Sequence, residues 1–210
     1  MPITQLLHRS TDLVAENERL RTELEHARTE VHALLEQATT DELTGLLNRR
    51  GFLRMAESEL RQAQAGERPL TLVYVDVDGL KALNDEAGHE AGDALLIETA
   101  ALLRAAFHST DVLARLGGDE FVVLTHGLHG DGAIIRHRIA RLSEALHRAG
   151  TQSCEISVSL GVILAGPSVV PALDDLLDQA DKAMYEIKHA RPGLHGAHRH
   201  RHSPTLSLAI

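Results

Sequence analysis

The chain has little of several features that would restrict its class. Cys154 is the only cysteine among 210 residues, so no disulfide can form within the chain, and a reducing compartment suits it. No stretch approaches the roughly 20 consecutive apolar residues needed to span a bilayer. The first residues also lack the basic region and apolar core of a secretory signal. We therefore expect a cytoplasmic protein that does not associate with membranes.

Aromatic residues and positive charge are also scarce. The chain contains two Tyr, three Phe and no Trp, and its formal net charge is -9. Non-specific nucleic-acid binders normally cluster Lys and Arg against the phosphates and stack bases on aromatic side chains. The composition therefore argues against that class. An acidic protein can still bind nucleotides where a metal ion screens its carboxylates from the phosphates.

The first 40 residues are predicted to form one long helix with a heptad repeat. Glu16, Glu23 and Glu30 occupy g positions, and Arg21 and Arg28 occupy e positions. In a parallel pair, Glu16 would therefore face Arg21 of the second chain, and Glu23 would face Arg28. Asn17 at an a position favours two strands in a single register. We expect a parallel dimeric coiled coil over residues 1–40, and the alternative is a solvated single helix. The d positions hold Leu6, Leu13, Leu20, Ala27 and Leu34, and the a positions hold Ser10, Asn17, Leu24, Val31 and Ala38.

The remaining chain alternates helical and strand patterns. No Rossmann-type glycine fingerprint is present, so the pattern favours an α/β (α+β) sandwich with helices over one sheet. We expect this domain to span 41–192. The His-rich residues 193–210 lack a zinc-binding spacing and are predicted to be a disordered tail. The expected helices begin near 48 (with Phe52, Met55 and Leu60 at helical spacing) and cover 90–107, 134–149 and 173–189, and the expected strands cover 70–77, 112–116, 121–124 and 156–164.

Two acidic clusters stand where strands are predicted to end or turn. Asp76 and Asp78 close one strand, and their spacing sends both side chains to one face. Asp119 and Glu120 follow a Gly-Gly turn. If the two strands are neighbours, these carboxylates converge into an oxygen-rich site of the kind that Mg²⁺ prefers. The alternative is a pair of ordinary surface turns, in which Asp and Gly are common.

The second cluster resembles the signature loop of the GGDEF diguanylate cyclases. Further segments match the motifs of that family in family order, and together they cover the chain from Asp41 to Lys188. The matching segments are 41–50 (DELTGLLNRR), 76–85 (DVDGLKALND), 88–93 (GHEAGD), 117–121 (GGDEF), 157–162 (SVSLGV) and 180–188 (ADKAMYEIK).

The resemblance implies a fold like the nucleotidyl-cyclase and polymerase palm, with a central antiparallel sheet flanked by helices. It also implies a set of site residues. Asp76, the carbonyl of Val77 and Asp119 would hold two Mg²⁺ ions per GTP, with Mn²⁺ as a substitute. Glu120 would lie beside the attacking 3'-hydroxyl, and either Glu120 or Asp119 would take its proton.

Further residues are implied to bind GTP. Asn84 and Asp93 would contact the guanine edge, where a carboxylate accepts from N1 and N2 hydrogens that adenine cannot supply. The residues implied to contact the triphosphate are Lys81, Lys188 and the backbone of Gly79 and Leu80. Arg191 would also contact it, although it lies one position earlier in the sequence than the corresponding arginine of the family.

The implied activity is the condensation of two GTP molecules into cyclic di-GMP with release of two pyrophosphates. Each chain would hold one GTP, so a homodimer is implied, and the coiled coil would set the approach of the two half-sites. The alternative is a catalytically weak domain that binds GTP as a dimeric regulatory module. The source of the input signal stays open: a sensor in a larger parent protein, a bound partner, or an engineered truncation.

The chain departs from the family pattern in places. Leu80 replaces the usual Phe, which is a mild apolar exchange. The inhibitory product site of the family needs Arg-x-x-Asp before the glycines, and this chain has His108 there with Asp111 retained. A largely neutral His cannot replace the bidentate guanidinium. We therefore predict weak or absent feedback inhibition by this route.

Overall fold

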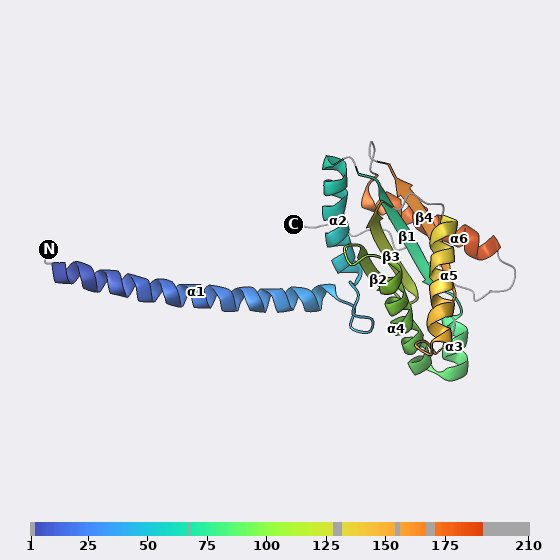
Figure 1. Cartoon of the computed structure of the whole chain (residues 1–210), viewed down its shortest axis with the longest axis horizontal. Coiled ribbons are helices and arrows are strands. Elements are labelled where there is room, and N and C mark those ends of the chain that lie inside the picture. The colour runs from blue at the N-terminus through green and yellow to red at the C-terminus, as the bar shows by residue number, and fades with distance from the viewer. Residues whose placement is uncertain (1–2, 67, 128–131, 154–155, 167–170, 191–210) are drawn as a thin grey trace, which may run out of the picture. The chain divides into compact units, whose positions relative to one another are not determined.

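The computed structural model describes residues 3–66, 68–127, 132–153, 156–166 and 171–190 (Figure 1). Contacts within the chain divide it into two units, Met1–Thr40 and Asp41–Ile210. Each unit is described by itself. Among the described helices, none is both long and apolar enough to cross a lipid bilayer.

The first unit is a single helix, α1 (Ile3–Thr39), as predicted. Arg19 pairs along its surface with Glu16 at 2.8 Å and with Glu23 at 3.8 Å. Such exposed pairs contribute only a few tenths of a kcal/mol. Among the described side chains, the large apolar ones at predicted a and d positions are solvent-exposed in the single chain, as is the neighbouring Leu35. Pairing with a second helix stays a prediction. The exposed a and d side chains are Leu20, Leu24, Val31 and Leu34.

The second unit is built on a four-stranded antiparallel sheet with strand order β2-β3-β1-β4. The strands are β1 (Leu70–Val77), β2 (Val112–Gly117), β3 (Glu120–His126) and β4 (Val158–Ala165). Every residue of β1 is buried, because this inner strand has neighbours on both edges and helices over both faces. Asp76 therefore lies near the end of an inner strand that is packed on both faces and paired on both edges.

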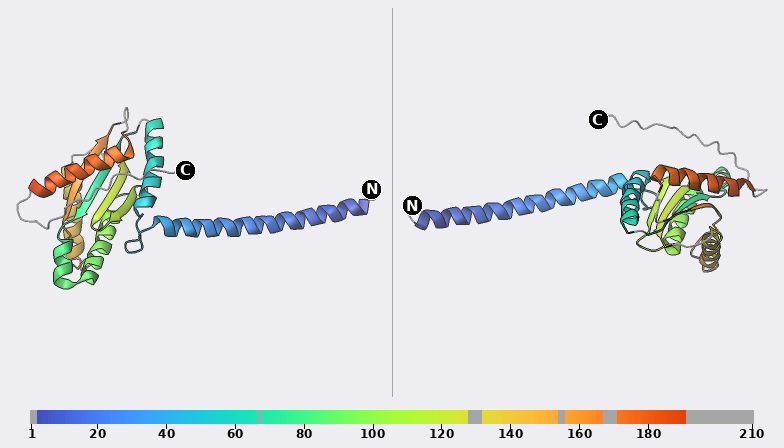
Figure 2. Two further views of the ribbon diagram at one scale, coloured as in Figure 1. Left: turned by 180° about the vertical axis from the view of Figure 1, so that it is seen from behind. Right: turned by 90° about the horizontal axis from the view of Figure 1, so that it is seen from above.

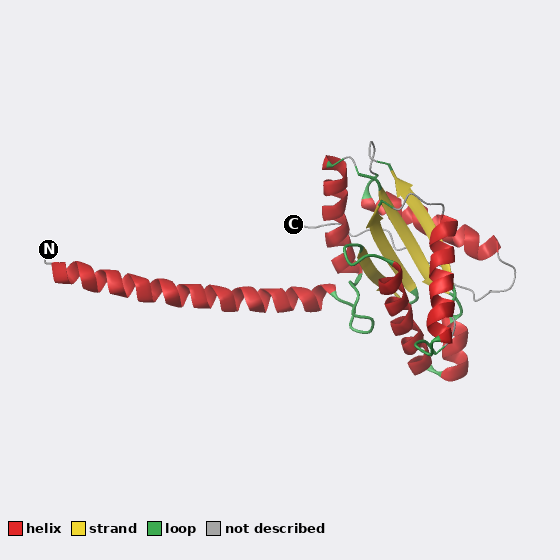
Figure 3. Cartoon of the chain, viewed as in Figure 1, coloured by secondary structure: helices red, strands yellow, loops and turns green. Residues whose placement is uncertain are grey.

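Helices cover both faces of the sheet (Figures 2 and 3). On one face, α2 (Arg49–Ala65) and α6 (Leu173–Ala190) pack on a cluster that includes Phe52, Tyr74 and Met184. On the other face, α4 (His89–Ala106) and α5 (Gly132–Arg148) pack on Val75, Phe121 and their neighbours. The expected fold class, an antiparallel sheet flanked by helices, is confirmed.

Two details differ from the sequence expectations. A short additional helix, α3 (Leu80–Ala87), lies between β1 and α4, and none of its side chains is fully buried. Met55 was placed on the apolar face of α2 with Phe52 and Leu60, but it is 45% exposed. The helix itself begins as expected, because the Asn48 side chain caps it by accepting from the backbone N–H of Gly51 at 3.0 Å.

Candidate active site

Pairing between β1 and β3 brings the two acidic clusters together. Asp76 lies directly opposite Glu120 in the strand register. One residue further on, the backbone N–H of Val77 donates to the carbonyl oxygen of Asp119 at 3.0 Å. Residues more than 40 positions apart in the sequence therefore share one end of the sheet. The structure thus supports the expectation that the carboxylates of the two acidic clusters lie close together.

Arg115 fixes the turn that carries Asp119. Its Nε and Nη2 donate to the carbonyl oxygen of Gly118 at 3.0 and 2.8 Å, and its Nη1 lies 3.3 Å from each carboxylate oxygen of Asp41. Gly118 has a φ of 54°, in the left-handed region that favours glycine. The β2–β3 register shifts between Arg115 and Gly117, which ends regular pairing at this turn. One guanidinium therefore links the turn to the first residue of the unit.

The Asp41 carboxylate is well suited to this contact. Burial acts to raise its pKa, but hydrogen bonds from the hydroxyl and backbone N–H of Thr44 and the charge of Arg115 together lower it. Asp41 therefore stays ionised opposite the guanidinium. The sequence did not predict the contact between Asp41 and Arg115, because the two residues lie in separate segments and neither segment shows which residue the other contacts.

Asp76 is a buried carboxylate beside a lysine. Its exposed fraction is only 5%, and Lys188 from α6 donates to Oδ1 at 2.5 Å. Burial and the negative charges of Asp119 and Asp78 raise the pKa of Asp76 to about 6, against the opposing effect of Lys188. Lys188 was predicted to contact phosphate, and in this structure its partner is Asp76.

Asp78 has a different environment. Hydroxyl groups of Ser157 and Ser159 donate to its two carboxylate oxygens at 2.7 and 2.8 Å. The backbone N–H of Asp78 also donates to the carbonyl oxygen of Ser157 at 3.0 Å. Asp78 therefore ties the end of β1 to the start of β4. This tie explains why two serines alternate in the segment 157–159.

The helices α3 and α4 hold the residues predicted to bind the base. The Oδ1 atom of Asn84 is buried, with no hydrogen-bond partner among the described residues. A Cβ atom at Gly92 would lie 1.9 Å from that oxygen, so only glycine lets the Asn84 side chain occupy this position. Asp93 follows Gly92 and is exposed. A buried amide oxygen without a partner is a costly group, and a ligand is one source of the missing donor.

The residues predicted to contact the triphosphate are less closely grouped. Gly79 stands at the N-terminal end of α3, directly after β1, and Leu80 begins that helix. Lys81 is exposed on α3. Lys188 contacts Asp76, and Arg191 lies outside the described residues.

The oxygen atoms predicted to hold Mg²⁺ can be compared with the ligands that a divalent cation prefers. Among the described residues, no group of three or more His, Cys, Asp or Glu side chains is arranged to hold a metal. The predicted set needs only two carboxylates, from Asp76 and Asp119, and the carbonyl of Val77. These are hard oxygen donors, and the repulsion that raises the pKa of Asp76 is what a cation would offset. The residues fit Mg²⁺ in charge and ligand type.

Two further features lie outside this group. Asp111 accepts a hydrogen bond from the backbone N–H of His108 at 2.8 Å, so the Asp side chain closes its own turn.

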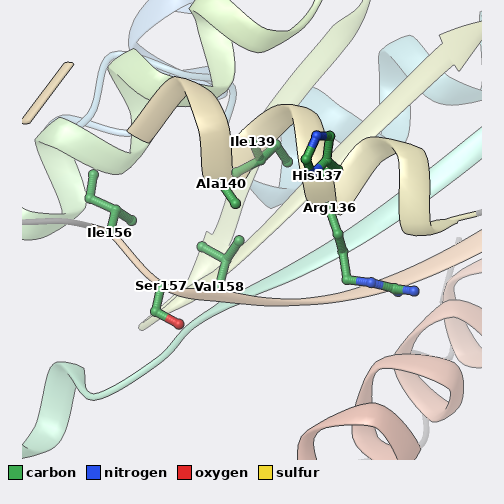
Figure 4. Close-up of a pocket in the computed structure, with 7 residues that line it drawn as sticks. All are labelled: Arg136, His137, Ile139, Ala140, Ile156, Ser157 and Val158. Carbon is green, nitrogen blue, oxygen red and sulfur yellow. The ribbon is translucent and has the colours of Figure 1, made fainter. Parts of the chain in front are cut away.

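A pocket of about 420 Å³ lies between α5 and the segment leading into β4 (Figure 4). None of the residues predicted to bind metal or nucleotide lines it. Its lining residues are Arg136, His137, Ile139, Ala140, Ile156, Ser157 and Val158.

Comparison with known proteins gives consistent matches. The family "Diguanylate cyclase, GGDEF domain" matches residues 38–193. The bifunctional diguanylate cyclase/cyclic di-GMP phosphodiesterase MucR of Pseudomonas aeruginosa is 36% identical over 170 residues, 80% of this chain and 24% of MucR. Diguanylate cyclase DgcS of Shewanella oneidensis is 34% identical over 155 residues, 72% of this chain and 50% of DgcS. The chain thus spans about a quarter to a half of the length of these relatives.

A solved structure agrees with this fold. The coiled coil and GGDEF domain of DgcB from Caulobacter crescentus, in complex with c-di-GMP, matches with a TM-score of 0.63 and 26% identity. The match covers 88% of this chain and 95% of that one. Since the family match includes both acidic clusters and well over half of the residues, the chain belongs to the GGDEF diguanylate cyclase family.

Proposed function

We propose that this protein is a diguanylate cyclase that condenses two GTP molecules into cyclic di-GMP and releases two pyrophosphates. The observation that carries the proposal is the pairing of Asp76 with Glu120, with Asp119 alongside, at one end of the sheet. Family membership and relatives named as diguanylate cyclases support it.

The metal site is part of the proposal. Asp76, Asp119 and the carbonyl of Val77 would hold Mg²⁺, two ions for each GTP, and Mn²⁺ would substitute. The cation would offset the charge of the phosphates and steady the attacking and leaving oxygens. Lys188 neutralises Asp76 in the structure. A cation held by Asp76 would take over that role and would leave the Lys188 ammonium available to the triphosphate.

Recognition of guanine would use α3 and α4. The buried Oδ1 of Asn84 needs a donor, and the guanine edge offers N–H groups there. Asp93 would accept from the same edge and so disfavour adenine, which lacks those hydrogens. Lys81, Arg191 and the backbone N–H groups of Gly79 and Leu80 would contact the triphosphate.

The reaction would need two chains. Each half-site holds one GTP, and Glu120 lies beside its 3'-hydroxyl, which must attack the α-phosphate held by the other chain. Positioning and charge supply most of the rate enhancement in such phosphoryl transfers. Pairing of α1 as a parallel coiled coil would keep the two half-sites at high effective concentration.

Incubation of the protein with Mg²⁺ and either GTP or ATP tests the proposal. We expect pyrophosphate and a cyclic guanine dinucleotide from GTP, and little of either product from ATP. Binding of GTP without turnover, measured by calorimetry, would instead favour a GTP-binding dimeric regulatory module. Equal turnover of ATP would contradict the roles of Asn84 and Asp93.

A further inference from the structure

Tyr74 lies beside the acidic end of the sheet but belongs to none of the matched motifs. It precedes Asp76 by two residues on β1, so both side chains leave the sheet on the same face. Tyr74 is paired with Val122 and Asp76 with Glu120, which makes Tyr74 the diagonal neighbour of Glu120 across the strands. Diagonal neighbours are within reach of an aromatic side chain.

The Tyr74 ring is fixed by packing. It is 7% exposed and belongs to the buried cluster formed by the sheet with α2 and α6. A Phe ring would serve that packing equally well. Burying a hydroxyl group costs free energy unless the group is hydrogen-bonded. Packing alone therefore does not account for the hydroxyl group, which needs a polar partner.

The Tyr74 hydroxyl meets charged groups from three elements. The Glu120 carboxylate of β3 is its diagonal neighbour and lies within hydrogen-bonding reach. The Asp181 carboxylate of α6 and the Arg49 guanidinium of α2 are close enough to act on it electrostatically. Burial first, and then the charges of Glu120 and Asp181, raise the pKa of Tyr74, while Arg49 acts in the opposite direction. A phenol is protonated near neutral pH, so the Tyr74 hydroxyl can donate a hydrogen bond to the carboxylate.

We propose that Tyr74 is a positioning residue for the reaction, and that its hydroxyl holds the Glu120 carboxylate in the orientation that the 3'-hydroxyl requires. The inference rests on the proposed function for the identity of that hydroxyl. One Glu120 oxygen accepts from Tyr74, which leaves the other to face the site. Without this bond the Glu120 side chain can turn among its staggered conformers, and fewer of them place an oxygen at the reacting group.

Tyr74→Phe tests this role because it removes one oxygen atom and keeps the ring. We expect kcat to fall about tenfold or more, the scale set by loss of a hydrogen bond to a charged group. The KM for GTP should stay within about twofold, because the base and triphosphate contacts are elsewhere. The matched control is Tyr185→Phe, at the only other tyrosine, which is 43% exposed on α6. It should keep the wild-type kcat.

Unchanged kcat in Tyr74→Phe, with an active wild type, would overturn the inference. A rise in KM without a fall in kcat would do the same. Inactivity of the wild type would instead contradict the proposed function.

A double-mutant cycle in metal-free protein tests the contact without any activity. Urea unfolding is compared for wild type, Tyr74→Phe, Glu120→Ala and the double variant. We expect Tyr74→Phe to lower the unfolding midpoint in the wild type and to lower it less, or not at all, in the Glu120→Ala background. Equal shifts in both backgrounds would show that the hydroxyl is not coupled to Glu120 and would refute the proposal.

Discussion

Asp76, which we propose as a metal ligand, acts against the stability of its own fold. The carboxylate is buried, and two other acids act on it, so ionisation is costly even with Lys188 as a partner. Its folded-state pKa of about 6 lies above the ordinary 3.8. The folded protein therefore binds more protons than the unfolded chain between these values. This group stabilises the fold most below pH about 4, and the contribution is lost as the pH rises through about 6.

Asp76→Asn should therefore be more stable than wild type in metal-free solution. At pH 7.5 we expect the free energy of unfolding to rise by about 1 to 3 kcal/mol, because the amide need not be ionised. At pH 4 the gain should vanish, since the wild-type carboxyl is then protonated in the folded state. Urea denaturation in the presence of a chelator, at both pH values, measures this difference.

The control for that experiment is Asp85→Asn, which removes an exposed carboxylate on α3. It should change stability by less than about 0.5 kcal/mol. A less stable Asp76→Asn protein at pH 7.5 would mean that the Lys188 contact outweighs burial, contrary to our account.

The predicted site residues differ in how far the sequence could place them. The sequence singled out Asp76, Asp119 and Glu120 as candidates because each lies in a short local motif, and strand pairing brings them together. The link from Arg115 to Asp41 and Gly118 could not be predicted, since it depends on a side chain crossing between segments 74 positions apart. Lys188 was assigned to phosphate, and the short distance to Asp76 emerges only when α6 packs over β1.

At the scale of elements, α3 and α4 form the base-binding end of the proposed site. The sequence pattern did not predict α3, because the helix has only eight residues and buries no side chain fully. The longer helices were predictable because apolar residues recur at helical spacing, and the strands because short apolar, β-branched runs are bounded by turn residues.

Gly92→Ala should disturb the position of Asn84. The new Cβ would lie 1.9 Å from Oδ1, so the amide must move away. We expect the KM for GTP to rise about fivefold or more, with a smaller change in kcat, because ground-state base contacts are lost. Steady-state kinetics with GTP measures both constants.

Gly166→Ala is the matched control, because its Cβ would meet no atom within 4 Å. Its KM should equal that of the wild type. If Gly92→Ala folds and binds GTP normally, Asn84 does not contact the base as we propose.

At the scale of the whole molecule, we propose that the two units have different roles. The exposed apolar a and d positions of α1 suit a second copy of the helix, and the second unit holds half of the proposed two-chain site. The pattern of heptads was visible in the sequence. Pairing itself could not be settled from one chain, because a helix with an exposed apolar stripe is compatible with several partners.

Deleting residues 1–38 should make activity depend on protein concentration. Without α1, two half-sites meet only by free diffusion, so specific activity should fall at least tenfold at low protein concentration and recover as the concentration rises. Product formation measured across a dilution series, for the full chain and the truncated chain, tests this. Identical specific activity at every dilution would exclude a role for α1 in pairing the sites.

The central claim is that Asp119 and its neighbours form the site of a cyclase. The most direct measurement is the rate of cyclic di-GMP and pyrophosphate formation from GTP and Mg²⁺, for wild type and Asp119→Ala side by side, with folding of the variant checked by thermal melting. We predict two pyrophosphates for each cyclic di-GMP from the wild type, and a rate at least about 100-fold lower in the variant, because a metal ligand is lost. An unchanged rate in a folded Asp119→Ala protein would contradict the account.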